Sequence, residues 1–367
     1  MIDRRVRIGI LIGLAAGVAV VLLTRGPRAP AMPPHGPLLS DCDGALRSIV
    51  IQYVPEAAPI VQTAYAQLLA ALPADVAVYA ICPDAEAFAD LRARLGPAGA
   101  RLKPVAARHP ITCWSRDRWL AFGPARPAGR CLLMAPAEET AAAVWPQRAG
   151  DARTAFDLAR GAEKVAAFRS PLAFDGGDFG ADDRTVFVTP EVARRNVGTR
   201  VRSTEELVRM LEDATGKAVV LLDRAPLHHA GMFMMAAGNR TVLVGDPSVG
   251  ARAAVAFADP DFSAATQALF DAVADRCVRE GYRVVRMPLV PAGDGRTWLT
   301  WLNVLIDARD GRRTVYMPVY DGAQPLNDAA EAIWRSVGHD VVRIDCTQVY
   351  PHSGSLHCLV NVLQRDD

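Results

Sequence analysis

Short apolar runs alternate with longer amphipathic stretches along the chain from about residue 45 onward. The short runs predict strands and the longer stretches predict helices. The predicted strands lie at 48–54, 76–81, 185–190, 218–223, 241–247, 282–288, 297–307, 314–319 and 341–346. The predicted helices lie at 56–73, 83–96, 203–216, about 261–280 and about 327–337.

Local end signals support several of these elements. The helix at 83–96 stops at Gly96, and the helix at 203–216 opens with a capping box from Ser203 to Glu206. The apolar runs RWLAFGP and RCLLMAP flank a Pro-Gly turn at 127–129, which predicts a hairpin. No charge run or low-complexity break divides residues 45–363, so we expect one α/β domain over residues 45–367.

The N-terminus has a different pattern. Basic residues at positions 4, 5 and 7 precede an uncharged apolar run from 8 to 24, and a Pro- and Gly-rich stretch follows. We read residues 1–25 as a signal anchor or signal peptide, favouring an uncleaved anchor, and residues 26–44 as a linker. The expected location is a membrane anchor through residues 8–24 with an extracytoplasmic domain, periplasmic or secreted if the segment is cleaved.

Composition narrows the partners. The 367 residues carry a formal net charge of +1, and no basic stripe predicts a nucleic-acid surface. A small molecule or a peptide is the expected partner, and a homo-oligomer is left open. The seven cysteines include no CxxC pair, so no metal site and no cofactor are predicted from their spacing. In an oxidising compartment their odd number leaves at least one thiol free or paired between chains.

Four stretches combine polar groups and turn residues in apolar surroundings. Taken singly, each has an ordinary explanation: Asp117 can pair with a neighbouring arginine, an Asp-Gly-Gly-Asp stretch can be a turn, and Cys358 can be a small core residue. The four stretches are CWSRDRW at 113–119, FDGGDFG at 174–180, LHHAGMF at 227–233 and GSLHCLVN at 354–361.

Their order along the chain resembles the agmatine deiminase and peptidylarginine deiminase-like family of guanidine-modifying enzymes. The runs TWLTWLN and MPVYDGAQPLNDAAEAIW precede GSLHC at the spacing of that family. The resemblance extends from about residue 45 to the end and is strongest after residue 110. It implies a five-bladed, pseudo-symmetric α/β propeller, the deiminase fold, with the site at its centre.

The resemblance also implies roles for individual residues. Cys358 takes the position of the nucleophile, His229 that of the acid-base group, and Asp175 that of the carboxylate bonded to the histidine. The implied substrate-binding residues are Asp117, Arg116, Gly177 and Asn303. The implied chemistry is attack of the Cys358 thiolate on a guanidinium carbon, loss of ammonia, and hydrolysis of the thiouronium adduct to a ureido product.

One position departs from the family pattern. The family has His-x-Asp, whose Asp is a second guanidinium ligand, whereas this chain has His229-Ala230-Gly231. Asp178 is a candidate to reach in instead. The predicted function is a Cys-dependent hydrolase acting on a guanidine compound or peptidyl arginine, with activity reduced by Gly231.

The alternatives are a deiminase-fold binding module with impaired catalysis and an amidinotransferase. A metal site of His228, His229 and His357 is a more remote hypothesis, because no ligand spacing supports it.

Overall fold

The computed structural model describes residues 32–124, 129–137, 148, 150–253 and 259–366. These include a compact unit that runs from Pro34 to the C-terminus. The apolar run predicted to cross a membrane, residues 8–24, lies outside the described residues. Within the described ranges, no helix combines the length and apolarity needed to span a bilayer.

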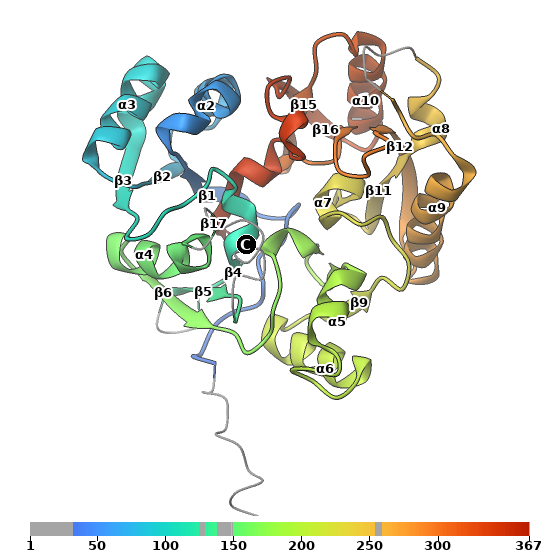
Figure 1. Cartoon of the computed structure of the whole chain (residues 1–367), viewed down its shortest axis with the longest axis horizontal. Helices are drawn as coiled ribbons and strands as arrows, with labels where there is room; N and C mark the ends of the chain where they lie inside the picture. The colour runs from blue at the N-terminus through green and yellow to red at the C-terminus, as the bar shows by residue number, and fades with distance from the viewer. Residues whose placement is uncertain (1–31, 125–128, 138–147, 149, 254–258, 367) are drawn as a thin grey trace, which may run out of the picture. The chain divides into compact units, whose positions relative to one another are not determined.

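Five sheets of three or four strands make up this unit, arranged as blades around a common centre (Figure 1). The first blade along the chain contains β4 (Leu120–Phe122), β5 (Cys131–Ala135) and β6 (Val165–Arg169), and the second contains β7 (Phe179–Ala181), β8 (Thr185–Val188) and β9 (Ala218–Leu221). The third contains β10 (Met234–Ala236), β11 (Thr241–Asp246), β12 (Arg283–Pro291) and β13 (Trp298–Thr300), and the fourth β14 (Leu305–Arg309), β15 (Arg312–Val319) and β16 (His339–Asp345). The fifth contains β17 (Val360–Asp366), β1 (Ala45–Gln52), β2 (Ala77–Cys82) and β3 (Leu102–Ala106). The predicted five-bladed α/β architecture is therefore confirmed.

Each blade repeats one topology. A strand pairs antiparallel with the central strand, and the central strand pairs parallel with the strand after it, as in β4–β5–β6. A helical connection joins the two parallel strands, as expected for a parallel pair. These helices are α2 (Ala58–Ala71), α3 (Ala85–Leu95), α4 (Thr154–Gly161), α5 (Pro190–Asn196), α6 (Thr204–Thr215), α8 (Pro247–Gly250), α9 (Ala264–Arg279) and α10 (Gln324–Ser336).

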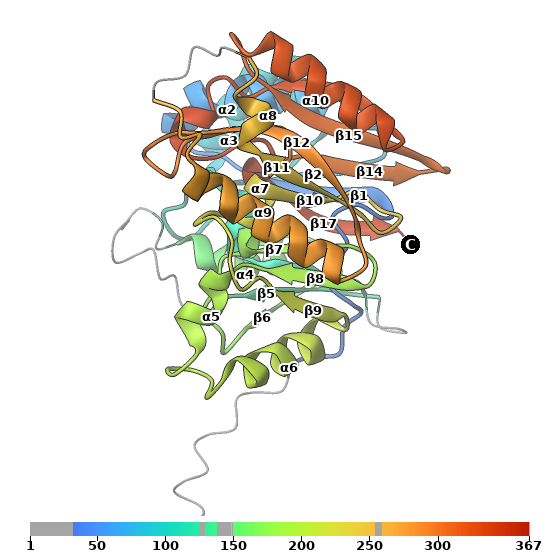
Figure 2. The same ribbon diagram turned by 90° about the vertical axis from the view of Figure 1, so that its right-hand side faces the viewer.

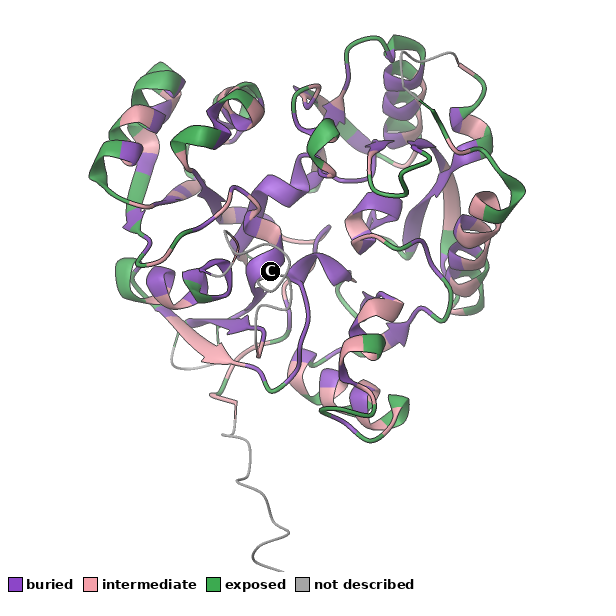
Figure 3. Ribbon diagram, in the orientation of Figure 1, coloured by how far each residue is buried: buried purple, intermediate pink, exposed green. Residues whose placement is uncertain are grey.

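The helices lie on the outside of the blades, and buried residues gather toward the centre (Figure 3). Helix ends follow the signals in the sequence. The Ser203 side chain accepts a hydrogen bond from the Glu206 amide at the start of α6, and Gly96 and Gly216 end their helices with φ of +56° and +67°. The predicted pairing of 118–124 with 130–136 is also confirmed, because β4 and β5 are antiparallel.

The predicted strand at 297–307 is wrong as a single element. It is two strands, β13 and β14, which belong to different blades, with residues 301–304 between them. The Trp301 indole and the Asn303 side-chain amide in this break are buried, and Trp301 Nε1 donates to Asn327 Oδ1 at 2.8 Å. An unbroken apolar run does not reveal that its two halves pair with different neighbours.

The N-terminal strand and the C-terminal strand close the ring. β1 pairs antiparallel with β17, with Ile49 opposite Val362 and Ile51 opposite Val360. Figure 2 shows β1 and β17 as neighbours, although they come from opposite ends of the chain. The compact unit also begins upstream of the boundary predicted at residue 45: the amide of Leu38 donates to the Thr215 carbonyl at 2.9 Å, and that of Asp41 to the Ala181 carbonyl at 2.8 Å.

Candidate active site

Each blade delivers at least one predicted site residue at the same place in its topology. The residue stands in the turn that precedes the antiparallel strand of its blade, and several of these turns are single helical turns. Asp117 lies in the turn Ser115–Arg118, Asp175 precedes the turn Gly176–Asp178, and Cys358 lies in the turn His357–Leu359. His229 caps the short helix α7 (Ala230–Phe233), and Asn303 lies in the break before β14.

His229 is the centre of the predicted site. Its Nδ1 lies 3.2 Å from Asp117 Oδ1, and its Nε2 lies 3.6 Å from Asp175 Oδ2. Burial alone lowers the pKa of this imidazole, but the charge of Asp117 and hydrogen bonds with Asp175 and Cys358 raise the pKa of His229 well above its usual value. The ring is therefore charged at neutral pH and lies beside the thiol.

Asp175 remains ionised behind the histidine. Burial opposes its charge, but the bond to His229 and the nearby Arg118 and Arg195 hold the pKa of Asp175 well below its usual range. Arg195 lies 3.2 Å from Asp175 Oδ2. The Asp175 carboxylate lies close to the histidine, at the 3.6 Å given above.

Asp117 forms ion pairs with two arginine side chains of the protein itself. Its Oδ2 lies 3.2 Å from an Arg148 nitrogen and 3.5 Å from an Arg118 nitrogen. Arg118 is completely buried and also lies 3.5 Å from Asp151 Oδ2. The carboxylate predicted to bind a substrate guanidinium is thus placed for that geometry and already contacts arginine nitrogens.

Cys358 is fixed through its backbone by Asn303. The Cys358 amide donates to Asn303 Oδ1 at 3.1 Å, and the His357 amide donates to the Asn303 carbonyl at 3.1 Å. All seven cysteines fall within the described residues, and none forms a disulfide. Burial raises the pKa of the six thiols other than Cys358.

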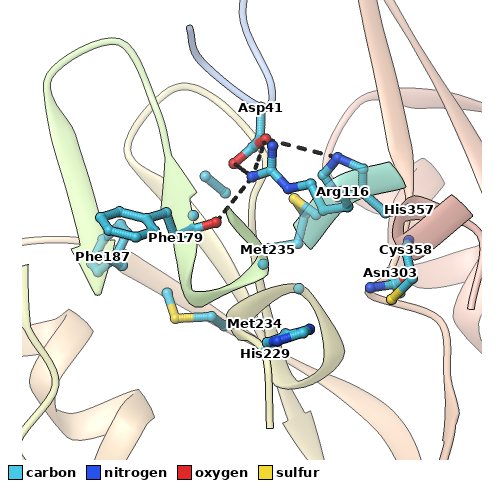
Figure 4. Close-up of a pocket in the computed structure, with 14 residues that line it drawn as sticks. Asp41, Arg116, Phe179, Phe187, His229, Met234, Met235, Asn303, His357 and Cys358 are labelled. Carbon is cyan, nitrogen blue, oxygen red and sulfur yellow. Dashed lines mark hydrogen bonds and ion pairs between the residues drawn. The ribbon is translucent and has the colours of Figure 1, made fainter. Parts of the chain in front are cut away.

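Cys358 and His229 border two cavities. The larger, of about 730 Å³, is lined by Asp117, Arg148 and both of these residues. The smaller is drawn in Figure 4, with His229, Asn303, His357 and Cys358 around it. It is lined mainly by apolar atoms, and its polar members include Asp41, Arg116, Asn303 and His357.

Two predicted substrate-binding residues serve other contacts. Arg116 turns its guanidinium to Asp41 Oδ1 at 3.1 Å and to the Phe179 carbonyl at 3.0 Å, as Figure 4 shows. Gly177 packs under the histidine: a Cβ there would lie 2.6 Å from His229 Cγ and 2.9 Å from Asp117 Oδ1. Only glycine lets the backbone pass this close to the ring.

The Asp178 side chain does not line the smaller cavity, to which Gly231 belongs. Its Oδ2 accepts the Asp175 amide at 2.9 Å and its Oδ1 accepts the Thr189 hydroxyl at 3.0 Å. Burial raises the pKa of Asp178 and the charge of Asp175 adds to this effect, while His229 and Arg195 oppose it. The turn Gly176–Asp178 is therefore held by the carboxylate that the sequence left as a candidate ligand.

Sequence reasoning missed several charged residues around the site. Arg118 and His357 stand inside the singled-out motifs, directly beside Asp117 and Cys358. The motifs gave Arg118 no role, and His357 was considered only as a ligand of the remote metal site. Asp151 and Arg148 come from the segment before α4, and Asp41 from the predicted linker. No group of three His, Cys, Asp or Glu side chains in the described part of the chain is arranged to hold a metal ion.

Comparisons with known proteins agree with this fold. Agmatine deiminase of C. jejuni superposes with a TM-score of 0.68 at 11% identity, covering 93% of this chain and 99% of that one. Agmatine deiminase of Enterococcus faecalis gives a TM-score of 0.66 at 13% identity over 91% and 99% of the two chains. A candidate arginine deiminase from Porphyromonas gingivalis gives 0.67 at 20% identity over 89% and 97%.

At these identities the structures establish the fold alone. No functionally curated protein matches the sequence. The sequence model of the Porphyromonas-type peptidyl-arginine deiminase family, however, matches residues 51–362, which include every predicted site residue. The chain belongs to the family of Porphyromonas-type peptidyl-arginine deiminases.

Proposed function

We propose that this protein is a deiminase-type hydrolase that uses Cys358 to remove ammonia from a guanidine or amidine group. One observation carries the proposal: a charged His229 joins Cys358 to two carboxylates, Asp117 and Asp175, at the end of a cavity of about 730 Å³. Membership of the peptidyl-arginine deiminase family supports the same chemistry.

The proposed reaction begins with the Cys358 thiolate, which the His229 imidazolium stabilises. Sulfur adds to the central carbon of the guanidinium, and Asp117 holds the nitrogens by charge-assisted hydrogen bonds. His229 gives its proton to the departing nitrogen, which leaves as ammonia. The neutral imidazole then takes a proton from water, the hydroxyl adds to the thiouronium carbon, and the C–S bond breaks to release a ureido product.

Arg148 must leave Asp117, or share it, when a substrate guanidinium binds. Because Asp117 Oδ2 accepts from Arg148 at 3.2 Å, substrate competes with an internal group of the same chemistry. This competition favours substrates that gain further contacts along the large cavity over a free guanidinium ion. A panel of arginine, agmatine and arginyl peptides therefore covers the range of candidate substrates.

The test is release of ammonia with formation of a ureido product from that panel. Cys358→Ser abolishes the reaction if the thiol is the nucleophile, whereas Cys131→Ser, which alters a buried thiol in β5, leaves it intact. Unchanged turnover in Cys358→Ser contradicts the nucleophile assignment. Absence of product from every guanidine compound, with Cys358 also unreactive to a haloacetamidine, contradicts the hydrolase proposal.

A binding module of the same fold is the second candidate. Gly231 supplies no carboxylate and Arg148 already contacts Asp117, which favour this reading. Calorimetric binding of an arginyl peptide without turnover would support it. An amidinotransferase differs from both in passing the amidine to an amine instead of water, so a transferred product in the presence of amines identifies it.

We also propose that the domain is attached to a membrane through residues 8–24 and faces the extracytoplasmic side. The basic flank followed by the apolar run in the sequence supports this. Cell fractionation tests it: the full chain is expected in the membrane fraction, and a chain starting at residue 32 in the soluble fraction. Recovery of both in the soluble fraction contradicts the anchor.

A further inference from the structure

The side chain that Gly231 lacks would occupy a defined space. A Cβ at this position would lie 3.1 Å from Asn303 Nδ2 and 3.8 Å from His357 Nδ1. This space opens into the smaller cavity, which Cys358 and His229 also line. His357 Nδ1 therefore borders the same space beside the thiol that a carboxylate at position 231 would fill.

His357 is a buried residue with an unpaired ring nitrogen. Its side chain is 4% exposed, and within the described part of the chain its Nε2 has no hydrogen-bond partner. Burial and the positive charge of Arg116 lower the pKa of His357 to about 3, although Asp41 opposes them. The imidazole is neutral at neutral pH, so one ring nitrogen donates and the other accepts.

Asp41 determines which nitrogen accepts. Its Oδ1 lies 3.9 Å from His357 Nε2, a contact drawn in Figure 4, whereas Nδ1 is the His357 ring nitrogen near a Cβ at position 231. Arg116 at 3.1 Å and the Ala181 amide at 2.8 Å hold the carboxylate in place. Burial opposes the charge of Asp41, but the positive charge of Arg116 and the hydrogen bond from the Ala181 amide lower the pKa of Asp41, so it stays ionised. An ionised carboxylate beside Nε2 favours a proton on that nitrogen and leaves Nδ1 as the acceptor.

We propose that His357 Nδ1, with its tautomer set by Asp41, accepts a hydrogen bond from an N–H of the bound amidine or guanidine group, in place of the carboxylate that Gly231 does not supply. This assignment rests on the proposed function, because it concerns the same bound group. His357 is then a substrate-binding residue and Asp41 a positioning residue.

A neutral acceptor changes what the site selects. A second carboxylate would add attraction for any guanidinium, whereas an imidazole nitrogen adds a directional hydrogen bond without charge. The substrate class that fits therefore has an N–H on the nitrogen facing His357. The direction of this hydrogen bond contributes more to its binding at this position than its net charge does. An amidine meets this requirement as well as a guanidine does.

The contact can be measured on the full-length protein without knowing the substrate. In 2-chloroacetamidine, the Cys358 thiolate displaces chloride while the amidine occupies the nitrogen-binding contacts. Iodoacetamide alkylates the same sulfur but carries no amidine. The second-order rates of both reagents report binding and thiol reactivity separately in His357→Ala, His357→Asn, Gly231→Asp and the double variant Gly231→Asp/His357→Ala.

The matched control is His339→Ala. His339 in β16 is also a buried histidine whose two ring nitrogens have no hydrogen-bond partner, but it lies outside the linings of both site cavities. It reports the effect of removing a buried imidazole as such, and both alkylation rates are expected to stay at the wild-type value. Asp41→Asn tests the positioning role and is expected to lower the chloroacetamidine rate without adding to the effect of His357→Ala.

His357→Ala is expected to lower the chloroacetamidine rate about 10- to 100-fold and to leave the iodoacetamide rate unchanged. His357→Asn keeps an acceptor near the position of Nδ1 and retains most of the rate. In the Gly231→Asp background, where the new carboxylate takes over the contact, His357→Ala has little further effect.

Three outcomes overturn the contact. An equal loss of the chloroacetamidine and iodoacetamide rates in His357→Ala indicates a structural role. Additive effects of Gly231→Asp and His357→Ala indicate separate sites. A chloroacetamidine rate in His357→Asn as low as that in His357→Ala excludes His357 Nδ1 as a hydrogen-bond acceptor. The effects of Gly231→Asp and His357→Ala on the chloroacetamidine rate can be non-additive even if the protein hydrolyses no guanidine compound. That result contradicts the proposed hydrolase and supports the His357 contact. Failure of the contact and failure of the function are thereby separated.

Discussion

At the scale of the single residue, tight backbone packing beneath His229 fixes the place of its ring. The backbone of Gly177 passes so near the ring that any side chain would displace it. The position of the imidazole between Asp117 and Asp175 therefore depends on a residue that carries no chemistry of its own. A catalytic geometry can be lost at such a residue without loss of any functional group.

We predict that Gly177→Ala lowers turnover, or the chloroacetamidine rate, about 100-fold, because its Cβ would displace the His229 ring. Gly180→Ala is the matched control in the following strand, since the nearest atom to its Cβ would be 3.9 Å away. Its rate should stay close to wild type. Equal effects of the two substitutions would show that the site tolerates a shifted ring.

The charge of His229 also predicts how stability varies with pH. The fold raises the pKa of this ring, so its ion pairs with Asp117 and Asp175 contribute stability that is complete below about 6.5, the pKa in an unfolded chain. That stability is lost as pH rises through the raised pKa. The melting temperature of wild type should exceed that of His229→Gln at pH 6, and this difference should shrink toward pH 10.

The expected change is roughly 1–2 °C for each kcal/mol of lost pairing, because the entropy of unfolding grows with the length of the domain. His339→Gln serves as the control, because burial lowers the pKa of His339 to about 4 and the ring is neutral across this range. A difference that stays constant or grows from pH 6 to pH 10 would contradict a charged His229 in the folded protein.

At the scale of the element, the device that builds the site is a tight turn before a short strand. In the fourth blade this turn is the break between β13 and β14, which has no regular helical turn and which contains Asn303. The Asn303 side-chain oxygen accepts from the Cys358 amide, and its backbone carbonyl accepts from the His357 amide. The turn that exposes the sulfur is thus fixed by a neighbouring blade. The element carrying Cys358 does not position the thiol alone.

We predict that Asn303→Ala destabilises the protein by about 1–3 kcal/mol, because it leaves the buried Cys358 amide without a partner. It should also change the iodoacetamide rate of Cys358. Asn327→Ala in α10 removes another buried amide, bonded to Trp301 and Tyr320, and should reduce stability without altering that rate. Chemical denaturation and alkylation measure the two effects, and unchanged alkylation in Asn303→Ala would contradict its positioning role.

The sequence anticipated the elements better than their pairing. Periodicity and end signals located α3 and α6 with their glycine ends, because these signals are local. The run at 297–307 misled because a change of sheet partner leaves an apolar pattern intact. Only tertiary contacts decide where such a run divides.

The candidate site was anticipated in the same uneven way. Order along the chain brought Asp117, His229 and Cys358 together as candidates, and the structure places them in contact around one cavity. Asp41 escaped notice because a lone Asp in a segment that reads as a linker carries no pattern. Only the structure shows that Asp41 lies beside the Arg116 and His357 side chains and so belongs to the site.

At the scale of the whole molecule, the ring is closed by contacts between its two ends. Arg365 in β17 donates to the carbonyls of Gly44 at 2.8 Å, Asp41 at 3.0 Å and Ile306 at 2.8 Å. One side chain thereby joins the C-terminal strand to the N-terminal segment and to the adjacent blade. The contact holds Asp41 at the same time, so closure of the ring and completion of the site are linked.

We predict that Arg365→Met destabilises the protein by about 2–3 kcal/mol, because three carbonyls lose a donor. Arg47→Ala is the control in β1: its pairs with Asp75 and Asp366 are on the surface, so their loss should change the stability far less. Guanidinium denaturation measures both. Equal values would show that the ends of the chain are not joined through Arg365.

The pairing of β1 with β17 also has a consequence for synthesis. β1 is made before β17, and in the folded chain β17 covers the side of β1 opposite β2. Cys358 lies in the turn that directly precedes β17. The strand that covers the open side of β1 therefore also brings the Cys358 thiol to the candidate site, and a chain cut before residue 357 is expected to leave both the ring and the site incomplete.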